Sequence, residues 1–212
     1  MKTASTNPLK LLLSAICAGF CIGLGGAVYV AQISNKPLGA VLFCVGLYAI
    51  CEFKFHLFTG KVCYATERPV NSFWEFPVIW VGNFLGTGIV AFLLRQTRLL
   101  AANQAAAQAL VQVKNNDTLL SLFILGMFCN VFVFLAVEGF RSIPLQIGKY
   151  LAIFVGITVF ILSGYEHCVA DMFYYFMAGA MDGTGFCRLL VITAGNICGG
   201  LLAYQGVALA RR

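Results

Sequence analysis

The sequence predicts an all-α membrane protein with six transmembrane helices in two inverted halves of three, the second and fifth helices being interrupted. Three observations predict this fold class. Hydrophobic residues make up 60% of the 212 residues and charged residues 10%, whereas about a quarter of the residues in a soluble domain are charged. Six apolar segments approach the length of a membrane span, about 20 residues. Finally, matching polar motifs recur in the two halves of the chain.

The six apolar segments fill most of the chain, so we expect one transmembrane domain over residues 1–212, with halves at about 11–95 and 118–209. The segments are 11–33, 38–65, 73–95, 118–138, 147–181 and 186–209. The first apolar run continues to Ile33, which favours a retained span over a cleaved signal peptide. Residues 96–116 are rich in Ala and Gln and predict a helical connection outside the membrane.

The third and sixth segments carry the same Gly-Asn-x-x-Gly motif, at residues 82–86 and 195–199. Its glycines allow helices to approach closely. Its asparagines, Asn83 and Asn196, are predicted to be structural polar residues inside the membrane.

The second and fifth segments are long, and each contains a polar break, at residues 52–60 and 163–171. Broken helices at matching positions of inverted repeats commonly mark a substrate path. Both breaks contain ionisable residues, which we expect to be structural polar residues apart from the two histidines. They are Glu52, Lys54 and His56 in the first break, and Glu166, His167 and Asp171 in the second. The two breaks therefore predict a transport architecture.

Glu166 and His167 carry the sharpest chemical signal in the sequence. Ionisable groups at mid-membrane depth are costly and usually face the protein interior or a water-filled path. Histidine can exchange a proton near neutral pH, although a buried neutral histidine bonded to a backbone carbonyl is the structural alternative. Adjacent residues of a helix do not share a face, so we expect Glu166 to point away from the path and to bond loop backbone.

The distribution of cations predicts that both termini are cytoplasmic, because cytoplasmic loops carry an excess of Lys and Arg. With this orientation eight cations lie inside and five outside. The inside set is Lys2, Lys10, Lys61, Arg68, Arg141, Lys149, Arg211 and Arg212, and the outside set is Lys36, Arg95, Arg98, Lys114 and Arg188. We expect the chain to lie in a cell membrane, such as the bacterial inner membrane.

The spacing of the cations and of the cysteines argues against nucleic-acid binding, disulfides and a metal site. The net charge of +6 comes from cations scattered singly, which argues against nucleic-acid binding. The nine cysteines mostly lie in apolar stretches and form no C-x-x-C pair, so we expect packing residues rather than disulfides or a metal site. No cofactor is predicted.

Three motifs together resemble one known family. Residues 163–173, S-G-Y-E-H-C-V-A-D-M-F, are similar to the S-G-F-E-H-x-x-A-N-M signature of the formate/nitrite transporter family. Residues 57–60, L-F-T-G, resemble its E-L-F-T-G loop, and residues 126–130, G-M-F-C-N, its G-x-x-x-N in the fourth span. Both Gly-Asn-x-x-Gly motifs match as well, and the resemblance runs over nearly the whole chain in order.

The resemblance implies an aquaporin-like protomer in a homopentamer, each protomer enclosing its own pore. It also implies roles for four residues. His167 interacts with the anion at the centre of the pore and exchanges a proton with it, while Asn130 lies opposite and hydrogen-bonds the same site. Thr59 contributes a hydroxyl group there. Lys114, at the family's spacing before the fourth span, sits in the outer vestibule and attracts anions.

The resemblance further implies two apolar constrictions in the pore. The outer one is formed by Phe43, Leu47 and Phe160, and the inner one by Leu57, Phe58 and Val133. A bare anion loses its hydration in such a ring and gains no partner, and protonation removes most of that cost. We therefore expect a channel, not an enzyme, for small monovalent anions of weak acids or their conjugate acids, such as formate, nitrite, hydrosulfide or short carboxylates, with protons and the lipid bilayer as further partners.

Three positions depart from the family pattern. The acidic residue usual before L-F-T is replaced by His56, with Glu52 four residues earlier on the same helical face. The asparagine usual after Glu-His is Asp171, and Lys54 is an added cation. Lys54 and Asp171 compensate each other in one interpretation, because isolated charges at this depth are costly. In the other, Lys54 snorkels to an interface.

Three other functions compete with an anion channel. A neutral-solute channel of aquaporin type predicts Asn-Pro-Ala motifs, and the sequence contains none. A membrane enzyme with a His/Glu/Cys site would need clustered ligands, whereas the chain has two histidines and no H-E-x-x-H. A purely structural membrane protein would have no need for two broken helices that contain ionisable residues.

Overall fold

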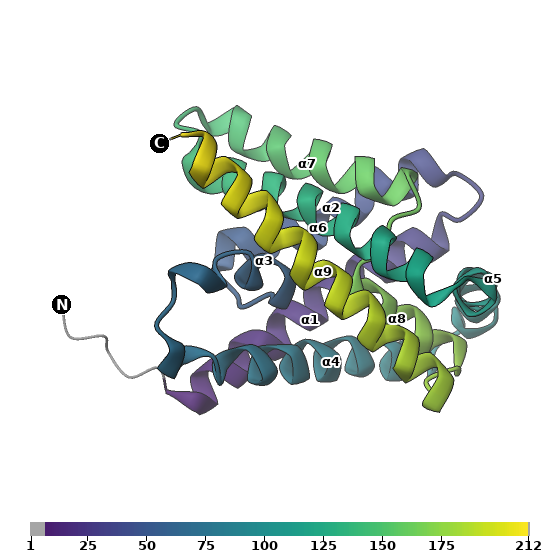
Figure 1. Cartoon of the computed structure of the whole chain (residues 1–212). Coiled ribbons are helices and arrows are strands. Elements are labelled where there is room, and N and C mark those ends of the chain that lie inside the picture. The colour runs from purple at the N-terminus through teal and green to yellow at the C-terminus, as the bar shows by residue number, and fades with distance from the viewer. Residues whose placement is uncertain (1–6, 212) are drawn as a thin grey trace.

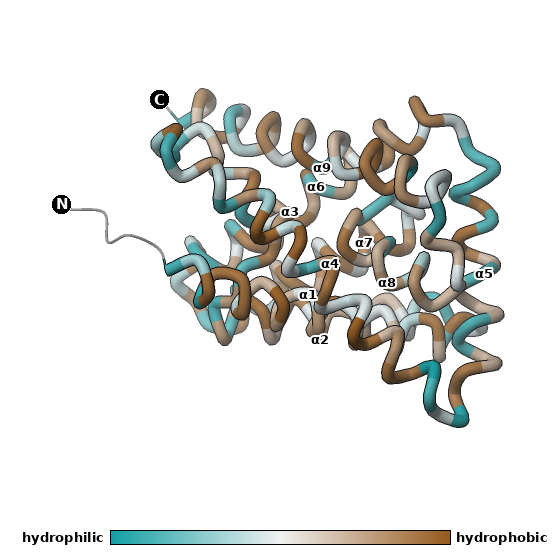
Figure 2. The backbone as a smooth tube through the Cα atoms, turned by 90° about the horizontal axis from the view of Figure 1, so that it is seen from below, coloured by the Kyte–Doolittle hydropathy of each residue, from teal (hydrophilic) through white to brown (hydrophobic). Residues whose placement is uncertain are grey.

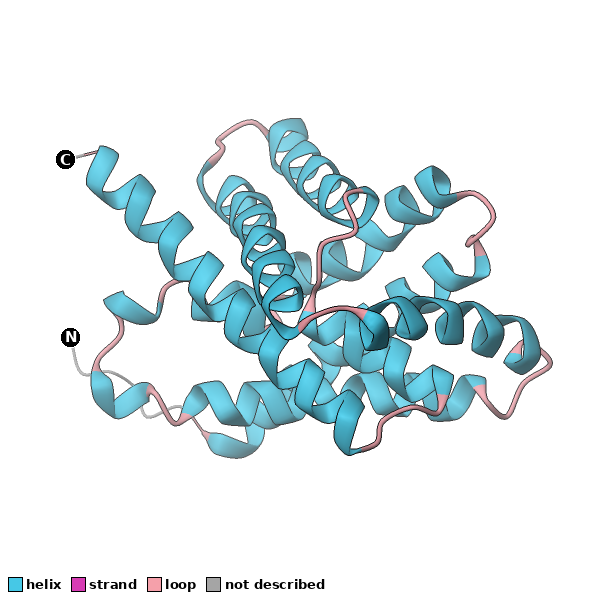
Figure 3. Ribbon diagram, turned by 45° about the vertical axis from the view of Figure 1, so that its right-hand side comes forward, coloured by secondary structure: helices cyan, strands magenta, loops and turns pink. Residues whose placement is uncertain are grey.

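A computed structural model describes residues 7–211, and all secondary structure in this range is helical (Figure 3). The longer helices are α1 (Pro8–Ala31), α2 (Lys36–Phe53), α4 (Glu75–Leu94), α5 (Leu100–Asn116), α6 (Leu119–Ser142), α7 (Gln146–Leu162) and α9 (Gly183–Ala210). Two short helices, α3 (Phe58–Val62) and α8 (Cys168–Ala178), follow α2 and α7. Two 3-10 turns, Ala65–Glu67 and Val70–Ser72, precede α4.

Five helices in the described range are long and apolar enough to cross a membrane. They are Pro8–Ala31, Lys36–Phe53, Val70–Leu94, Leu119–Ser142 and Gly183–Ala210. The shorter α7 and α8 are also apolar. Figure 2 shows many of the hydrophilic residues gathered toward two opposite ends of the molecule. The chain is therefore a multi-pass membrane protein.

Local sequence signals set where several helices begin. The Asn7 side chain accepts hydrogen bonds from the backbone N–H groups of Leu9 and Lys10, and Pro8 opens α1. Asn35 caps α2 in the same way through Leu38 N–H. A side-chain acceptor at this position satisfies a backbone N–H that the helix leaves unpaired, and proline suits the first helical turn.

The second and fifth apolar segments each comprise two helices separated by non-helical residues. Residues 54–57 lie between α2 and α3, and residues 163–167 lie between α7 and α8. Lys54, at the end of α2, has a φ of 58° in the left-handed region, which ends the helix abruptly.

The Gly-Asn motifs bring α4 against α1 and α9 against α6. A Cβ atom at Gly86 would lie 2.2 Å from Ile16 O, and one at Gly199 would lie 2.0 Å from Met127 O. Only glycine permits such close backbone approach. The same motif therefore makes the same kind of helix contact in both halves of the chain.

The helix ends define two sides of the molecule. The start of α1 and the end of α9 lie at one side, on the left in Figure 1, while α5 lies at the opposite side. We call these the terminus side and the α5 side.

Candidate transport path

Asn83 of α4 holds the first break in place. Its Oδ1 accepts the Phe58 backbone N–H at 2.8 Å, and so caps α3. Its Nδ2 donates to Ala15 O at 2.8 Å and to His56 O at 3.0 Å. One fully buried amide thus joins α1, α4 and the break.

Asn196 of α9 does the same for the second break. Its Oδ1 accepts the Cys168 backbone N–H at 2.9 Å, and its Nδ2 donates to Gly126 O and Glu166 O, both at 2.8 Å. Buried polar backbone groups need such partners. The two motif asparagines therefore occupy equivalent positions in the two halves.

The two breaks meet at the Thr59–His167 pair. Thr59 Oγ1 lies 2.9 Å from His167 Nε2. His167 Nδ1 accepts the Ala170 backbone N–H at 3.1 Å, so the neutral imidazole carries its hydrogen on Nε2 and donates it to Thr59. The Phe160 ring stacks on the imidazole at 5.7 Å. Both members of the pair are buried.

Two cavities approach this pair from opposite sides. The α5-side cavity, of about 250 Å³, is lined by His167, Phe43, Phe160 and Lys114 among others. The terminus-side cavity, of about 690 Å³, is lined at its apolar part by Leu47, Leu57 and Gly60, and beyond it by charged side chains. Neither cavity shares a lining residue with the other. Gly60, which adjoins Thr59 in the chain, lines the terminus-side cavity, and His167 lines the α5-side cavity, so the buried pair lies between the two cavities.

Lys114 is placed differently from a solvated vestibule lysine. It lies in the last turn of α5, is 9% exposed, forms an ion pair with Glu166 and lies 3.0 Å from Asp171 Oδ1. Burial favours the neutral amine, but the Asp171 and Glu166 carboxylates outweigh it and hold the pKa of Lys114 above its ordinary value. One cation thus faces two carboxylates, and its charge is compensated.

The expectation that Glu166 points away from the path and bonds loop backbone is wrong, because Glu166 lines the α5-side cavity. Its carboxylate pairs with Lys114, while its backbone carbonyl accepts from Asn196. The physical reason is that α5 folds over the second break and delivers a cation there. A buried carboxylate binds a cation in preference to a neutral donor.

The suggested compensation between Lys54 and Asp171 is also wrong. Asp171 pairs with Lys114, whereas Lys54 is exposed and lines the terminus-side cavity. Glu52 and His56 do not share a helical face, because α2 ends at Phe53. His56 instead hydrogen-bonds Ser14 through Nδ1 at 2.7 Å. Glu52 accepts from the Tyr150 hydroxyl at 3.1 Å.

Asn130 lies beside the pair but faces the backbone. Its Nδ2 donates to Thr59 O at 3.2 Å and to Asn196 O at 2.7 Å, because α6 runs against both α3 and α9. Asn130 lines neither cavity and makes no bond with the His167 side chain among the described residues. Its Nδ2 therefore positions the backbone of Thr59 and Asn196, whereas its buried Oδ1 has no hydrogen-bond partner among the described residues. Its expected contact with an anion opposite His167 stays a prediction.

The expected constriction residues divide between the two sides. Phe43 and Phe160 stand together, with ring centroids 6.4 Å apart, and line the α5-side cavity. Leu47 does not join them, because it lies a turn further along α2 and lines the terminus-side cavity with Leu57. Phe58 and Val133 are buried and line neither cavity.

Sequence reasoning missed several residues around Lys114. Tyr29 and Tyr174 line the α5-side cavity beside it. Arg188 of α9 donates to Lys114 O at 2.9 Å and to Asp117 O at 2.7 Å, which fixes the end of α5. An aromatic residue or a single arginine in an apolar stretch carries no spacing signal, so these contacts appear only in three dimensions.

Comparison with known proteins agrees with the motifs. The family model described as formate/nitrite transporter matches residues 1–210. The chain is 28% identical to the formate channel FocA of Haemophilus influenzae, over 80% of this chain and 66% of FocA. It is 29% identical to the nitrite transporter NirC of Salmonella typhimurium, over 95% and 82% of the two chains.

Two solved structures share the fold. One is a pentameric formate channel with formate bound, with a TM-score of 0.78, 26% identity, and coverage of 96% of this chain and 95% of that chain. The other is an FNT family ion channel, with a TM-score of 0.87, 28% identity, and coverage of 96% and 91%. These relatives are named as channels and transporters, not enzymes. The polytopic helical fold, the paired breaks and these comparisons agree, and the chain belongs to the formate/nitrite transporter family.

Proposed function

We propose that this chain conducts small monovalent anions of weak acids across a cell membrane, through the buried Thr59–His167 pair. The observation that carries the proposal is the 2.9 Å contact of these side chains between two opposed cavities. The names of the related formate channel and nitrite transporter support an anion as the substrate.

The pair offers an anion polar contacts between two apolar surfaces. Phe43 and Phe160 on one side and Leu47 and Leu57 on the other strip hydration from a small ion, which is costly unless hydrogen bonds replace it. The hydroxyl of Thr59 can donate to the anion, and the Nε2–H of His167 can do so when the anion replaces the Thr59 oxygen as its acceptor.

Proton exchange at His167 lowers the barrier further. In this step His167 first takes up a proton on Nδ1 from water in a cavity, which releases Nδ1 from the Ala170 N–H. Transfer of the Nε2 proton to the anion then gives a neutral acid and an imidazole that carries its hydrogen on Nδ1, and the acid crosses the apolar surfaces at lower cost than the anion. Uptake of a proton at Nε2 and loss of the Nδ1 proton, both exchanged with water, restore the resting imidazole. This scheme favours weak acids such as formic, nitrous or hydrosulfuric acid.

We propose six spans, with α2 and α3 forming the second and α7 and α8 the fifth, in a single domain over residues 1–212. The start of α1 and the end of α9 lie at one side (Figure 1), which supports termini on a common, cytoplasmic face. Lysine and arginine at that side, including Arg141 and Lys149, agree with this orientation.

A homopentamer is the assembly we propose, by analogy with the pentameric formate channel of similar fold. Mass measurement of the detergent-solubilised protein is expected to give five copies. A stable monomer or dimer in mild detergent would contradict this assembly.

The transport proposal is tested with purified protein in proteoliposomes. We expect inward flux of formate, nitrite or hydrosulfide that increases when the outside is more acidic, because protonation accompanies passage. Chloride should pass far more slowly, since it is the anion of a strong acid. Rapid flux of water or glycerol with no anion flux would instead identify a neutral-solute channel.

A further inference from the structure

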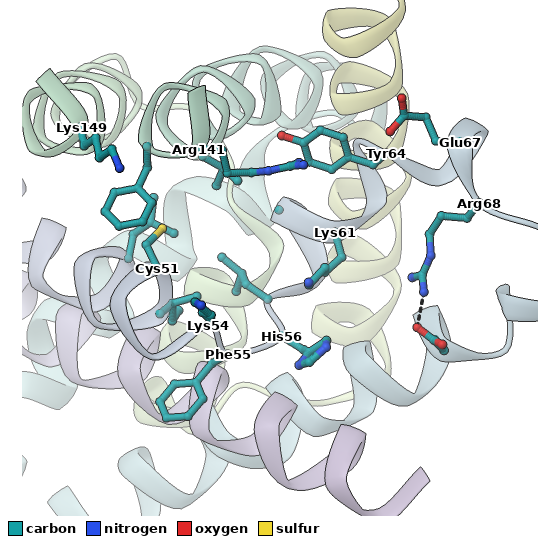
Figure 4. A pocket seen from close by; sticks show the side chains of 17 residues that line it. Cys51, Lys54, Phe55, His56, Lys61, Tyr64, Glu67, Arg68, Arg141 and Lys149 are labelled. Atoms are coloured by element: carbon teal, nitrogen blue, oxygen red, sulfur yellow. Dashed lines mark hydrogen bonds and ion pairs between the residues drawn. The ribbon is translucent and has the colours of Figure 1, made fainter. Parts of the chain in front are cut away.

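The terminus-side cavity is strongly cationic. Figure 4 shows Lys54, Lys61 and His56 toward the middle of the view, with Arg141 and Lys149 on one side and Arg68 on another. Its lining contains five lysine and arginine side chains and two carboxylates. The cations are Lys54, Lys61, Arg68, Arg141 and Lys149, and the carboxylates are Glu67 and Glu75. The α5-side cavity, by contrast, balances Lys36 and Lys114 against Glu166 and Asp171.

The two arginines already have partners, whereas the three lysines do not pair with carboxylates. Arg68 forms an ion pair with Glu75. Arg141 lies 3.9 Å from Glu138 and stacks over Tyr64 at 4.4 Å. In the described part of the chain, no ion pair involves Lys54, Lys61 or Lys149. Lys149 lies over the Phe140 ring at 5.9 Å, and the nearby Glu75 carboxylate, which already pairs with Arg68, also acts on Lys61. With five cations facing two carboxylates, the cavity lining keeps an excess of positive charge.

The backbone at Lys54 supports a use for its charge. Lys54 is the one non-glycine residue with positive φ among those described, at 58°. Glycine or asparagine takes this conformation more readily than lysine. Residues held in such conformations often cluster at binding sites. The turn at Lys54 ends α2 and leaves this side chain on the wall of the cavity.

From these observations we propose that the terminus-side cavity binds a multivalent oxyanion of the phosphate class, such as phosphate or pyrophosphate. The lining's excess of three positive charges over its carboxylates matches an anion with two or three negative charges, and lysine binds phosphate as a point charge. The cavity volume of about 690 Å³ lies within the range of small-molecule sites, about 300–1,000 Å³. A triatomic anion such as nitrite needs much less space.

A soluble oxyanion fits better than a lipid headgroup. The apolar part of the cavity is lined by Leu47, Leu57 and Gly60, which are buried inside the protein, so this part of the cavity does not open on the outer surface where lipid chains lie. An oxyanion bound to Lys54, Lys61 and Lys149 therefore occupies the mouth of the proposed path. Its effect on transport rests on the proposed function, but its binding does not.

Binding is measured by calorimetry on the detergent-solubilised assembly, with pyrophosphate as the probe at two salt concentrations. The wild type is expected to bind, and more weakly at high salt, because screening weakens attraction between exposed charges. Lys54→Asn removes the charge at residue 54 but keeps its left-handed backbone conformation. Lys149→Gln removes a charge that α7, a different helix, contributes to the cavity. Each removes one charge partner of the oxyanion and should weaken binding by about tenfold, a loss of about 1.4 kcal/mol.

Lys10→Gln is the matched control, because Lys10 is exposed in the first turn of α1 and lies outside the cavity lining. It should bind pyrophosphate like the wild type. Absence of millimolar binding by the wild type, equal affinity in all variants, or an equal loss with Lys10→Gln would overturn the proposal. Competition by a short-chain phosphatidylglycerol at the same site would also overturn it, in favour of a lipid headgroup. Failure of anion transport with binding intact would overturn only the proposed function.

Discussion

Replacing Lys114 with Met is expected to destabilise the folded protein by about 3–5 kcal/mol, the usual effect of removing one partner from a buried ion pair. Lys114 faces Glu166 and Asp171 in a buried site, so its loss leaves two carboxylates without a cation. The melting temperature of the purified assembly, measured by fluorescence, should therefore fall by a large amount.

The control for this substitution is Lys36→Met, because Lys36 lines the same cavity but is exposed. It should leave the melting temperature nearly unchanged. Asp171→Asn should restore part of the stability lost in Lys114→Met, since it removes one of the two unpaired carboxylates. A Lys114→Met protein that melts like the wild type would show that the ion pairs contribute no stability.

Asn196→Leu is expected to have a comparable effect. The substitution removes the partner of three buried backbone groups, those of Cys168, Gly126 and Glu166. Each unsatisfied group costs about 1–3 kcal/mol. The break before α8 should lose its fixed geometry, and transport should fall together with thermal stability.

Asn83→Leu provides the matched test in the other half, because Asn83 bonds Phe58, Ala15 and His56 in the same pattern. The two variants should lose similar stability. Thr184→Val, which removes a hydroxyl group from the same α9 helix, should cost much less, since Thr184 is exposed to its surroundings. A mild effect of Asn196→Leu alone would contradict the equivalence of the two breaks.

Features encoded locally could be predicted from the sequence. Apolar run length indicated the helices, and the repeated Gly-Asn motif indicated equivalent helix contacts, because close backbone approach requires glycine at those positions. The predicted helical connection at residues 96–116 corresponds to α5, Leu100–Asn116. His167 could be singled out since an ionisable residue in an apolar segment is costly.

Features that depend on distant contacts could not be predicted. The partner of Asp171 is Lys114, 57 positions away in the chain, because α5 packs on α8. No spacing pattern distinguishes Lys114 from Lys54 as that partner. Likewise, Leu47 and Phe43 lie one turn apart on α2, yet they line opposite cavities. The cationic character of the terminus-side cavity also arises only when α2, α3, α6 and α7 come together.

The most direct test of the central claim, that anions pass the Thr59–His167 pair, is stopped-flow formate or nitrite flux in proteoliposomes over a range of pH. Flux should fall by about 100-fold in His167→Asn, the scale of losing general acid–base catalysis, and its pH dependence should change. Thr59→Val should lower flux by about tenfold, as losing a hydrogen bond to a charged group does. Thr87→Val, whose wild-type hydroxyl bonds carbonyls of α4 away from both cavities, should transport normally. A folded His167→Asn assembly with the wild-type rate and the wild-type pH profile would contradict the account.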